Sequence, residues 1–190
     1  MTFSRKPIAF LLLALALVAT PARAVVNVEL YADTPLSDAA ASGDLKEVEQ
    51  ALLKGTDPNS GDRHGTPAMI FAAVNGQDGV IKLLLQHGAR VDAADQYGNT
   101  ALMAAAVKGR VETVRTLLAG GAKTDVQNKA GETALIRAAR AGQAGAVAAL
   151  IAGKADVNAT DFTGRSALSY AADGHNSRVI DLLRQAGAKP

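Results

Sequence analysis

The side chains with the most reactive chemistry in this sequence are three histidines, and their spacing argues against a shared site. His64, His87 and His175 are far apart in the chain and follow none of the short spacings that metal-binding histidines use. The chain has no cysteine, so it offers no thiolate as nucleophile or metal ligand. We therefore predict three isolated surface imidazoles, no metal site and no cofactor.

Three aspartates recur at equivalent positions, where a row of carboxylates could serve acid–base chemistry. Asp62, Asp95 and Asp161 each come shortly before a glycine, and Asn128 takes the same place between them. Short Asp and Asn side chains accept hydrogen bonds from the N–H groups of their own turn, and Asn is no acid. No serine lies in a nucleophile elbow, and no glycine-rich phosphate loop follows a strand pattern. We predict turn-stabilising residues and no enzyme activity.

The elements that position these residues repeat along the chain with a fixed period. Five copies of one outline begin at residues 34, 67, 100, 133 and 166, without insertion or deletion. The third copy begins TALMAAAVKG and the fourth TALIRAARAG. Strict repetition at this length is the signature of a stacked repeat architecture.

One copy shows how the repeat is expected to fold. Thr100 is placed to cap a short helix, because its hydroxyl can accept a hydrogen bond from a free N–H of the first turn. Leu102, Ala105 and Ala106 follow at helical spacing on one face, and a second helix begins near Val111. Both helices are too short to persist alone in water, so each copy must bury its apolar face against the next. The sequence predicts an all-α solenoid of helix–turn–helix units with short turn or hairpin connections.

This outline resembles the ankyrin repeat, a unit of two helices and a β-turn with a T-P-L-H-x-A start. The resemblance rests on TPL at 34–36, on DVNA at 156–159 and on Ala pairs such as 105–106 and 138–139. It implies an ankyrin-repeat domain of five units over residues 34–190. It also implies that the turn tips and the exposed side of each first helix form a concave protein-binding face.

The chain departs from the family pattern at several positions. The resemblance places a family histidine in a hydrogen-bond network between a helix start and the next turn. Here that position holds Ser37, Ile70, Met103, Ile136 and Ser169. We expect packing to replace the network. Pro67 cannot supply a hydroxyl cap, and Lys154 and His175 replace glycines that end helices, so the fourth and fifth units are expected to be the least regular.

The first residues have the three-part pattern of a secretory signal peptide. Arg5 and Lys6 precede an apolar run over 8–19, and an A-R-A motif ends at Ala24. The run is shorter than the roughly 20 residues that span a bilayer. We therefore expect residues 1–24 to be a cleaved signal peptide rather than a membrane anchor, and residues 25–33 to be a linker.

Cleavage changes the charge balance and indicates a compartment. The chain has 20 basic and 18 acidic side chains, and residues 1–24 hold three of the basic ones and none of the acidic ones, so the mature charge is 17 − 18 = −1. A charge near zero gives no support for a nucleic-acid partner. An exported chain without cysteine fits a bacterial periplasm best, with secretion as the second choice.

The candidate partner-binding residues are those that differ between copies at the turn tips and on the exposed side of the first helix. They are Arg63, His64, Gln96, Tyr97, Asn99, Lys108, Lys129, Arg137, Arg140, Phe162, Arg165 and Tyr170. Tyr97 and Phe162 either anchor a partner, as aromatic residues often do, or fold back over a neighbouring turn. Seven basic side chains in this region face two acids, Glu132 and Asp173. This imbalance either attracts an acidic protein surface or is ordinary solvated charge.

These features predict a monomeric, non-catalytic scaffold that binds one or more proteins with an acidic patch on its concave face. Nucleic-acid binding and stable membrane insertion are not expected. Exported proteins of this family include some that support antioxidant enzymes such as catalase and some that act as immunity proteins against toxins, and the residues do not choose between them. The rival class is a haem- or small-molecule-handling protein, for which the sequence lacks paired histidines and a core with room for a ligand.

Overall fold

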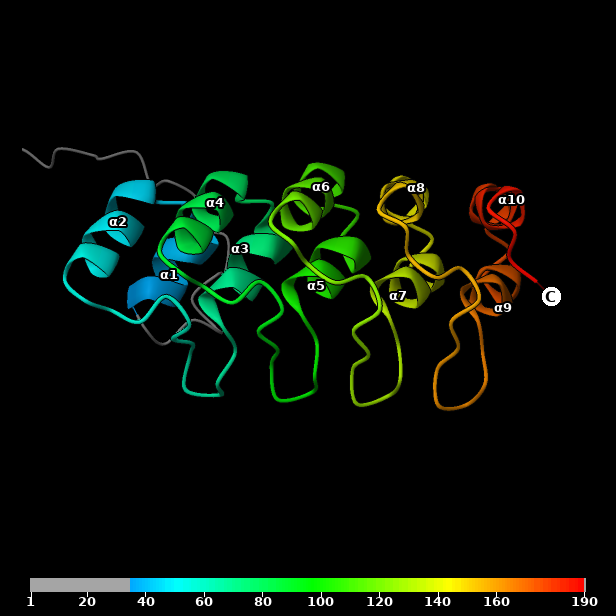
Figure 1. The fold of residues 1–190 in the computed structure, drawn as a ribbon, viewed down its shortest axis with the longest axis horizontal. Coiled ribbons are helices and arrows are strands. Elements are labelled where there is room, and N and C mark those ends of the chain that lie inside the picture. The colour runs from blue at the N-terminus through cyan, green and yellow to red at the C-terminus, as the bar shows by residue number, and fades with distance from the viewer. Residues whose placement is uncertain (1–34, 190) are drawn as a thin grey trace, which may run out of the picture.

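The computed structural model describes residues 35–189, which form ten α-helices in five helix–turn–helix pairs (Figure 1). The first helices of the pairs are α1 (Pro35–Ser42), α3 (Ala68–Asn75), α5 (Ala101–Val107), α7 (Ala134–Arg140) and α9 (Ala167–Asp173). The second helices are α2 (Leu45–Leu53), α4 (Asp78–Gln86), α6 (Val111–Ala119), α8 (Ala144–Ala152) and α10 (Ser177–Gln185). Extended pairing among the described residues is limited to three isolated bridges within the connecting loops. The fold is the all-α solenoid that the sequence predicts.

Helices of like position stack along the solenoid. Each first helix packs on the first helix of the next pair, and each second helix packs on the next second helix. Figure 1 shows these two rows, with the connecting loops extending from the first-helix row along one edge. The signal peptide and linker expected at 1–24 and 25–33 lie outside the described residues. Within residues 35–189, no helix is long and apolar enough to cross a membrane.

Small and branched apolar side chains fill the space between the pairs. In the third unit, Leu102, Ala105 and Ala106 are at most 1% exposed, and Val114 and Leu117 of α6 are completely buried. The two alanines let neighbouring first helices approach closely, because a methyl group takes up little space at the contact. The predicted core face is therefore confirmed.

Hydroxyl caps begin three of the first helices. The side chains of Thr100, Thr133 and Ser166 each accept a hydrogen bond from the backbone N–H three residues later, at 3.3 Å. Pro67 precedes α3 and makes no side-chain cap, as expected. Met103, one of the apolar residues at the family's histidine position, is 1% exposed. That position is therefore packed into the core.

The helix ends of the fourth and fifth units keep the repeat geometry, although within residues 35–189 the fourth unit lacks the loop bridge that the second, third and fifth units form. Lys154 and His175 adopt left-handed backbone conformations, with φ of 64° and 53°. Their glycine counterparts in other units, such as Gly121 and Gly142, have φ of 88° and 69°. The backbone keeps the repeat geometry at the cost of left-handed strain, because packing against the adjacent unit fixes where each helix ends.

Replacing Lys154 by glycine is expected to raise the free energy of unfolding by about 0.5–1 kcal/mol. Glycine removes the left-handed strain, which costs about 1–2 kcal/mol, but its unfolded state has more entropy to lose. Urea denaturation measures the change. Lys123→Gly is the control, since Lys123 is an exposed loop residue without a positive φ. A gain of similar size in that control would contradict the strain explanation.

Candidate partner-binding surface

The aspartate row stabilises the turns between units. The Oδ1 atoms of Asp62, Asp95 and Asp161 each accept hydrogen bonds from two backbone N–H groups of the same turn, at 2.8–3.0 Å. Asn128 makes the same pair of bonds at 2.9 Å. An amide therefore serves as well as a carboxylate here, as expected for a role that needs only an acceptor.

The turns are also joined to one another. The backbone N–H of Lys129 donates to the carbonyl of Tyr97 at 2.9 Å, and that of Phe162 donates to Ala130 at 3.2 Å. The third, fourth and fifth turns therefore form a continuous edge. A side chain at Gly131 would not fit, because a Cβ there would lie 2.5 Å from the backbone nitrogen of Phe162. Only glycine permits this close approach.

The two aromatic rings predicted at the turn tips are among the most exposed large apolar side chains of the described residues. Tyr97 is 63% exposed and Phe162 is 72% exposed. The Phe162 ring nevertheless lies against the fourth turn, since a Cβ at Gly131 would come within 2.6 Å of its Cδ1 atom. Phe162 thus folds over its neighbouring turn and still presents most of its surface to solvent.

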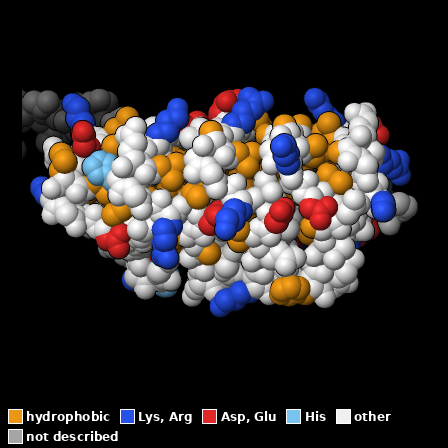
Figure 2. All heavy atoms as spheres, viewed as in Figure 1, with side chains coloured by type: hydrophobic (Ala, Val, Ile, Leu, Met, Phe, Trp, Pro, Cys, Tyr) orange, Lys and Arg blue, Asp and Glu red, His pale blue; other side chains and the backbone are white. Residues whose placement is uncertain are grey.

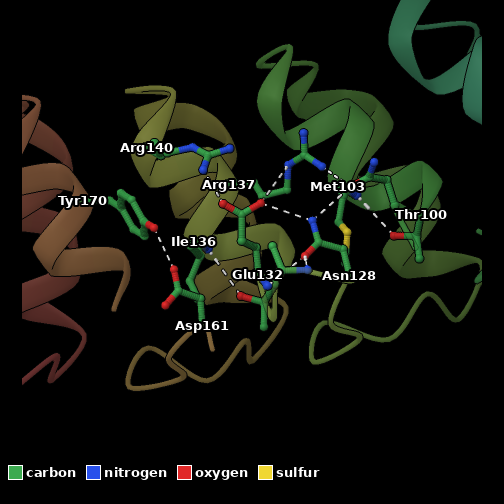
Figure 3. Close-up of polar contacts among 12 residues, drawn as sticks. Thr100, Met103, Asn128, Glu132, Ile136, Arg137, Arg140, Asp161 and Tyr170 are labelled. Atoms are coloured by element: carbon green, nitrogen blue, oxygen red, sulfur yellow. Dashed lines mark hydrogen bonds and ion pairs between the residues drawn. The ribbon is translucent and has the colours of Figure 1, made fainter. Parts of the chain in front are cut away.

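A polar network built around the buried side chains of Asn128 and Glu132 joins the third and fourth units (Figure 3). The Nδ2 group of Asn128 donates to Asn99 Oδ1 at 3.0 Å and to Glu132 Oε2 at 3.1 Å. Arg137 donates to the same Asn99 oxygen, and Arg140 donates to Glu132 Oε1. Glu132 is only 5% exposed, so the expectation that it faces solvent is wrong. The turn-to-helix polar network therefore persists, carried by residues other than the family's histidine.

Two arginines share the single carboxylate of Glu132. The Nε atom of Arg137 is 4.0 Å from Glu132 Oε2, and it is buried without a hydrogen-bond partner among the described residues. Burial lowers the pKa of Arg137, and the charge of Glu132 acts in the opposite direction. The buried carboxylate of Glu132 therefore neutralises part of the positive charge of Arg137 and Arg140. The excess of basic charge predicted for this surface is reduced accordingly.

Tyr170 makes both hydrogen-bonding and cation–π contacts in the fifth unit. Its hydroxyl donates to Asp161 Oδ2 at 2.7 Å, and the guanidinium of Arg165 lies 4.0 Å from its ring centroid. The guanidinium of Arg140 lies 5.6 Å from the same centroid. A hydrogen bond from the Thr163 hydroxyl, followed by that from Tyr170, holds the pKa of Asp161 below its usual value. The bond to Asp161 raises the pKa of Tyr170.

The candidate residues therefore separate into two groups. Those joined in the polar contacts of the third to fifth units are Asn99, Arg137, Arg140, Arg165 and Tyr170. The remaining seven are mostly exposed, and six of them form the tip row: Arg63, His64, Gln96, Tyr97, Lys129 and Phe162. Lys108, the seventh, is the C-cap residue that follows α5. Figure 2 shows basic and hydrophobic side chains but no acidic ones at its lower edge, where the turns of Figure 1 end.

A groove opens between the second and third turns. It has a volume of about 360 Å³ and is lined by Asp62, His64, Thr66, Phe71, Gln96 and Tyr97. Phe71 was missed in the sequence because it sits inside a helix pattern of core residues. Its register gives the signal that could have found it, since Phe71 holds the same repeat position as Arg137 and Tyr170.

No candidate metal-binding cluster lies among residues 35–189. Among the residues that the structure describes, no group of three or more His, Cys, Asp or Glu side chains could hold a metal ion.

A stack of helix pairs with a polar, aromatic edge of turns defines a repeat solenoid with one extended surface. A family model described as Ankyrin repeats (3 copies) matches residues 36–128 and 113–190. The matches span nearly all of the described residues, and the chain belongs to the ankyrin-repeat family. Ankyrin repeats generally mediate protein–protein interactions and are typically non-catalytic.

Proposed function

We propose that this chain is a periplasmic, non-catalytic scaffold that binds a partner protein on the face formed by the first helices and the tip row. The observation that carries the proposal is the exposure of Tyr97 and Phe162 at the turn tips. Large rings in such positions are costly to leave in water, and aromatic residues are enriched among the anchors of protein interfaces. The turns that hold them are tied together by backbone hydrogen bonds, so the rings are presented on a rigid edge.

The charge of the tip row favours a partner with an acidic surface. Lys129 lies at a turn tip, Lys108 is the C-cap of a first helix, and the tip row contains no acidic residue. Exposed charges of one sign steer a partner of the opposite sign and raise its rate of association. Arg137 and Arg140 contribute less to this electrostatic attraction, because both already pair with Glu132.

The proposal also specifies a compartment and two candidate partners. The signal-peptide pattern of residues 1–24 supports export to the periplasm. An antioxidant enzyme such as catalase is the first partner to test, and a toxin neutralised by this chain as its immunity protein is the second.

Replacing both anchors, Tyr97→Ala with Phe162→Ala, is expected to weaken binding of the partner at least about tenfold. The expectation follows because interface aromatic anchors each contribute more than about 1 kcal/mol. Pull-down from periplasmic extract followed by titration of the captured protein measures the loss. Leu53→Ala is the matched control, since Leu53 is an equally exposed apolar residue, at 74%, on α2. Equal binding by the double variant and the wild type would refute the anchors.

A further inference from the structure

The turn aspartates differ in what their second carboxylate oxygen does. Asp95 Oδ2 accepts a hydrogen bond from Asn99 Nδ2 at 3.0 Å, and Asp161 Oδ2 accepts one from the Tyr170 hydroxyl at 2.7 Å. Asp62 uses Oδ1 for its turn, as they do, but no described residue donates to its Oδ2. Asp62 is only 8% exposed. Asp62 Oδ2 is not among the fully buried unpaired atoms of the described residues, so this oxygen remains accessible as a hydrogen-bond acceptor.

The missing donor has an identifiable cause. Phe71 occupies in the second unit the position that Tyr170 occupies in the fifth, and Thr66 occupies the position of Asn99. Phenylalanine has no hydroxyl, so the internal bond of the fifth unit cannot form in the second. Asp62 and Phe71 both line the 360 Å³ groove, and Tyr97 lines it from the next turn. The unpaired carboxylate therefore belongs to a hollow with aromatic side chains in its walls.

We propose that this groove binds a tyrosine side chain of the partner protein, whose hydroxyl donates to Asp62 Oδ2 while its ring packs against Phe71 and Tyr97. The inference rests on the proposed function, since the tyrosine is supplied by the partner. The groove volume lies at the small end of the roughly 300–1,000 Å³ found for ligand pockets, which suits one side chain rather than a cofactor.

The chemistry of the groove selects tyrosine among the candidate side chains. Phenylalanine would bury the ring but leave the Asp62 oxygen unpaired. Lysine or arginine would satisfy the oxygen but would bring a cation close to Arg63, whose Nε donates to His64 in the wall of the groove. A phenol carries a neutral donor on an aromatic body, and the chain itself uses this pairing between Tyr170 and Asp161.

N-acetyl-tyrosinamide and N-acetyl-phenylalaninamide are the probes that test the groove without the partner. Titration of each into the full mature chain, followed by NMR on the His64 and Tyr97 resonances, is expected to show about tenfold tighter binding of the tyrosine amide. The ratio is that of one hydrogen bond to a charged acceptor. Equal affinity for the two amides, or tighter binding of N-acetyl-lysinamide, would overturn the proposal.

Asp62→Asn is the decisive variant. Asn128 shows that an amide supports this turn, so the fold is expected to survive while the acceptor Oδ2 becomes an NH2 group. The tenfold preference for tyrosine should disappear. Asp161→Asn is the matched control in the fifth unit and should keep the preference. A preference that survives Asp62→Asn would exclude Asp62 as the acceptor.

Phe71→Tyr provides a second, independent readout. The new hydroxyl should donate to Asp62 Oδ2 as Tyr170 does to Asp161, which blocks the acceptor and removes the tyrosine preference. The same bond should raise the midpoint of thermal unfolding by about 2–4 °C. If the chain prefers the tyrosine amide but captures no partner protein, the result counts against the proposed function alone. If it captures a partner but shows no preference for the tyrosine amide, the result counts against the tyrosine site alone.

Discussion

Glu132→Gln is expected to lower the free energy of unfolding by about 2 kcal/mol, a large loss for a change of one atom. The substitution removes the carboxylate that pairs with both Arg137 and Arg140. Removing one member of a buried ion pair leaves the other charge uncompensated, which costs about 3–5 kcal/mol when burial is complete. The side chains of Arg137 and Arg140 are 20% and 49% exposed, so water offsets part of that cost.

Urea denaturation of the variant beside a surface control measures this effect. Glu112→Gln breaks the pair between Glu112 and Arg115, whose side chains are 72% and 62% exposed, and is expected to cost less than about 0.5 kcal/mol. Losses of equal size in the two variants would show that the burial of Glu132 does not matter. The same experiment tests the surface indirectly, because Glu132 also holds Arg140 beside Tyr170.

Leu117→Ala is expected to lower the free energy of unfolding by about 3 kcal/mol. Leu117 is completely buried in α6 of the central unit. Truncating a buried leucine loses its transfer free energy and leaves a cavity, which together cost about 2–5 kcal/mol. In a solenoid each unit is stabilised mainly by its neighbours, so a defect in the middle weakens two interfaces at once.

The matched control for this prediction is the same substitution at the surface. Leu53→Ala removes a side chain that is 74% exposed and is expected to change the free energy of unfolding by less than about 0.5 kcal/mol. Chemical denaturation of both variants by circular dichroism separates them. A loss below about 1 kcal/mol in Leu117→Ala would mean that the core relaxes around the missing side chain.

The sequence by itself determined the repeat and its local structure. The period placed every pair of helices, and the hydroxyl at Thr100, the apolar spacing after it and the recurring glycines marked one unit after another. These signals are local: a cap, a helical face and a left-handed turn each depend on residues within a few positions. The left-handed conformations of Lys154 and His175 show the reverse influence, since there the stack imposed a geometry that the local sequence does not favour.

Only the tertiary structure decided which side chains of the surface are paired, buried or exposed. Asn99 and Asn128 are 29 residues apart, and Asn99 and Arg137 are 38 apart, so their bonds exist only once adjacent units stack. Glu132 looked like a surface acid because its burial depends on the helix and turn of neighbouring copies. The unpaired oxygen of Asp62 likewise follows from Phe71, nine positions along and on a different element. Local sequence encodes the unit, whereas the surface forms from side chains that meet across the boundaries between units.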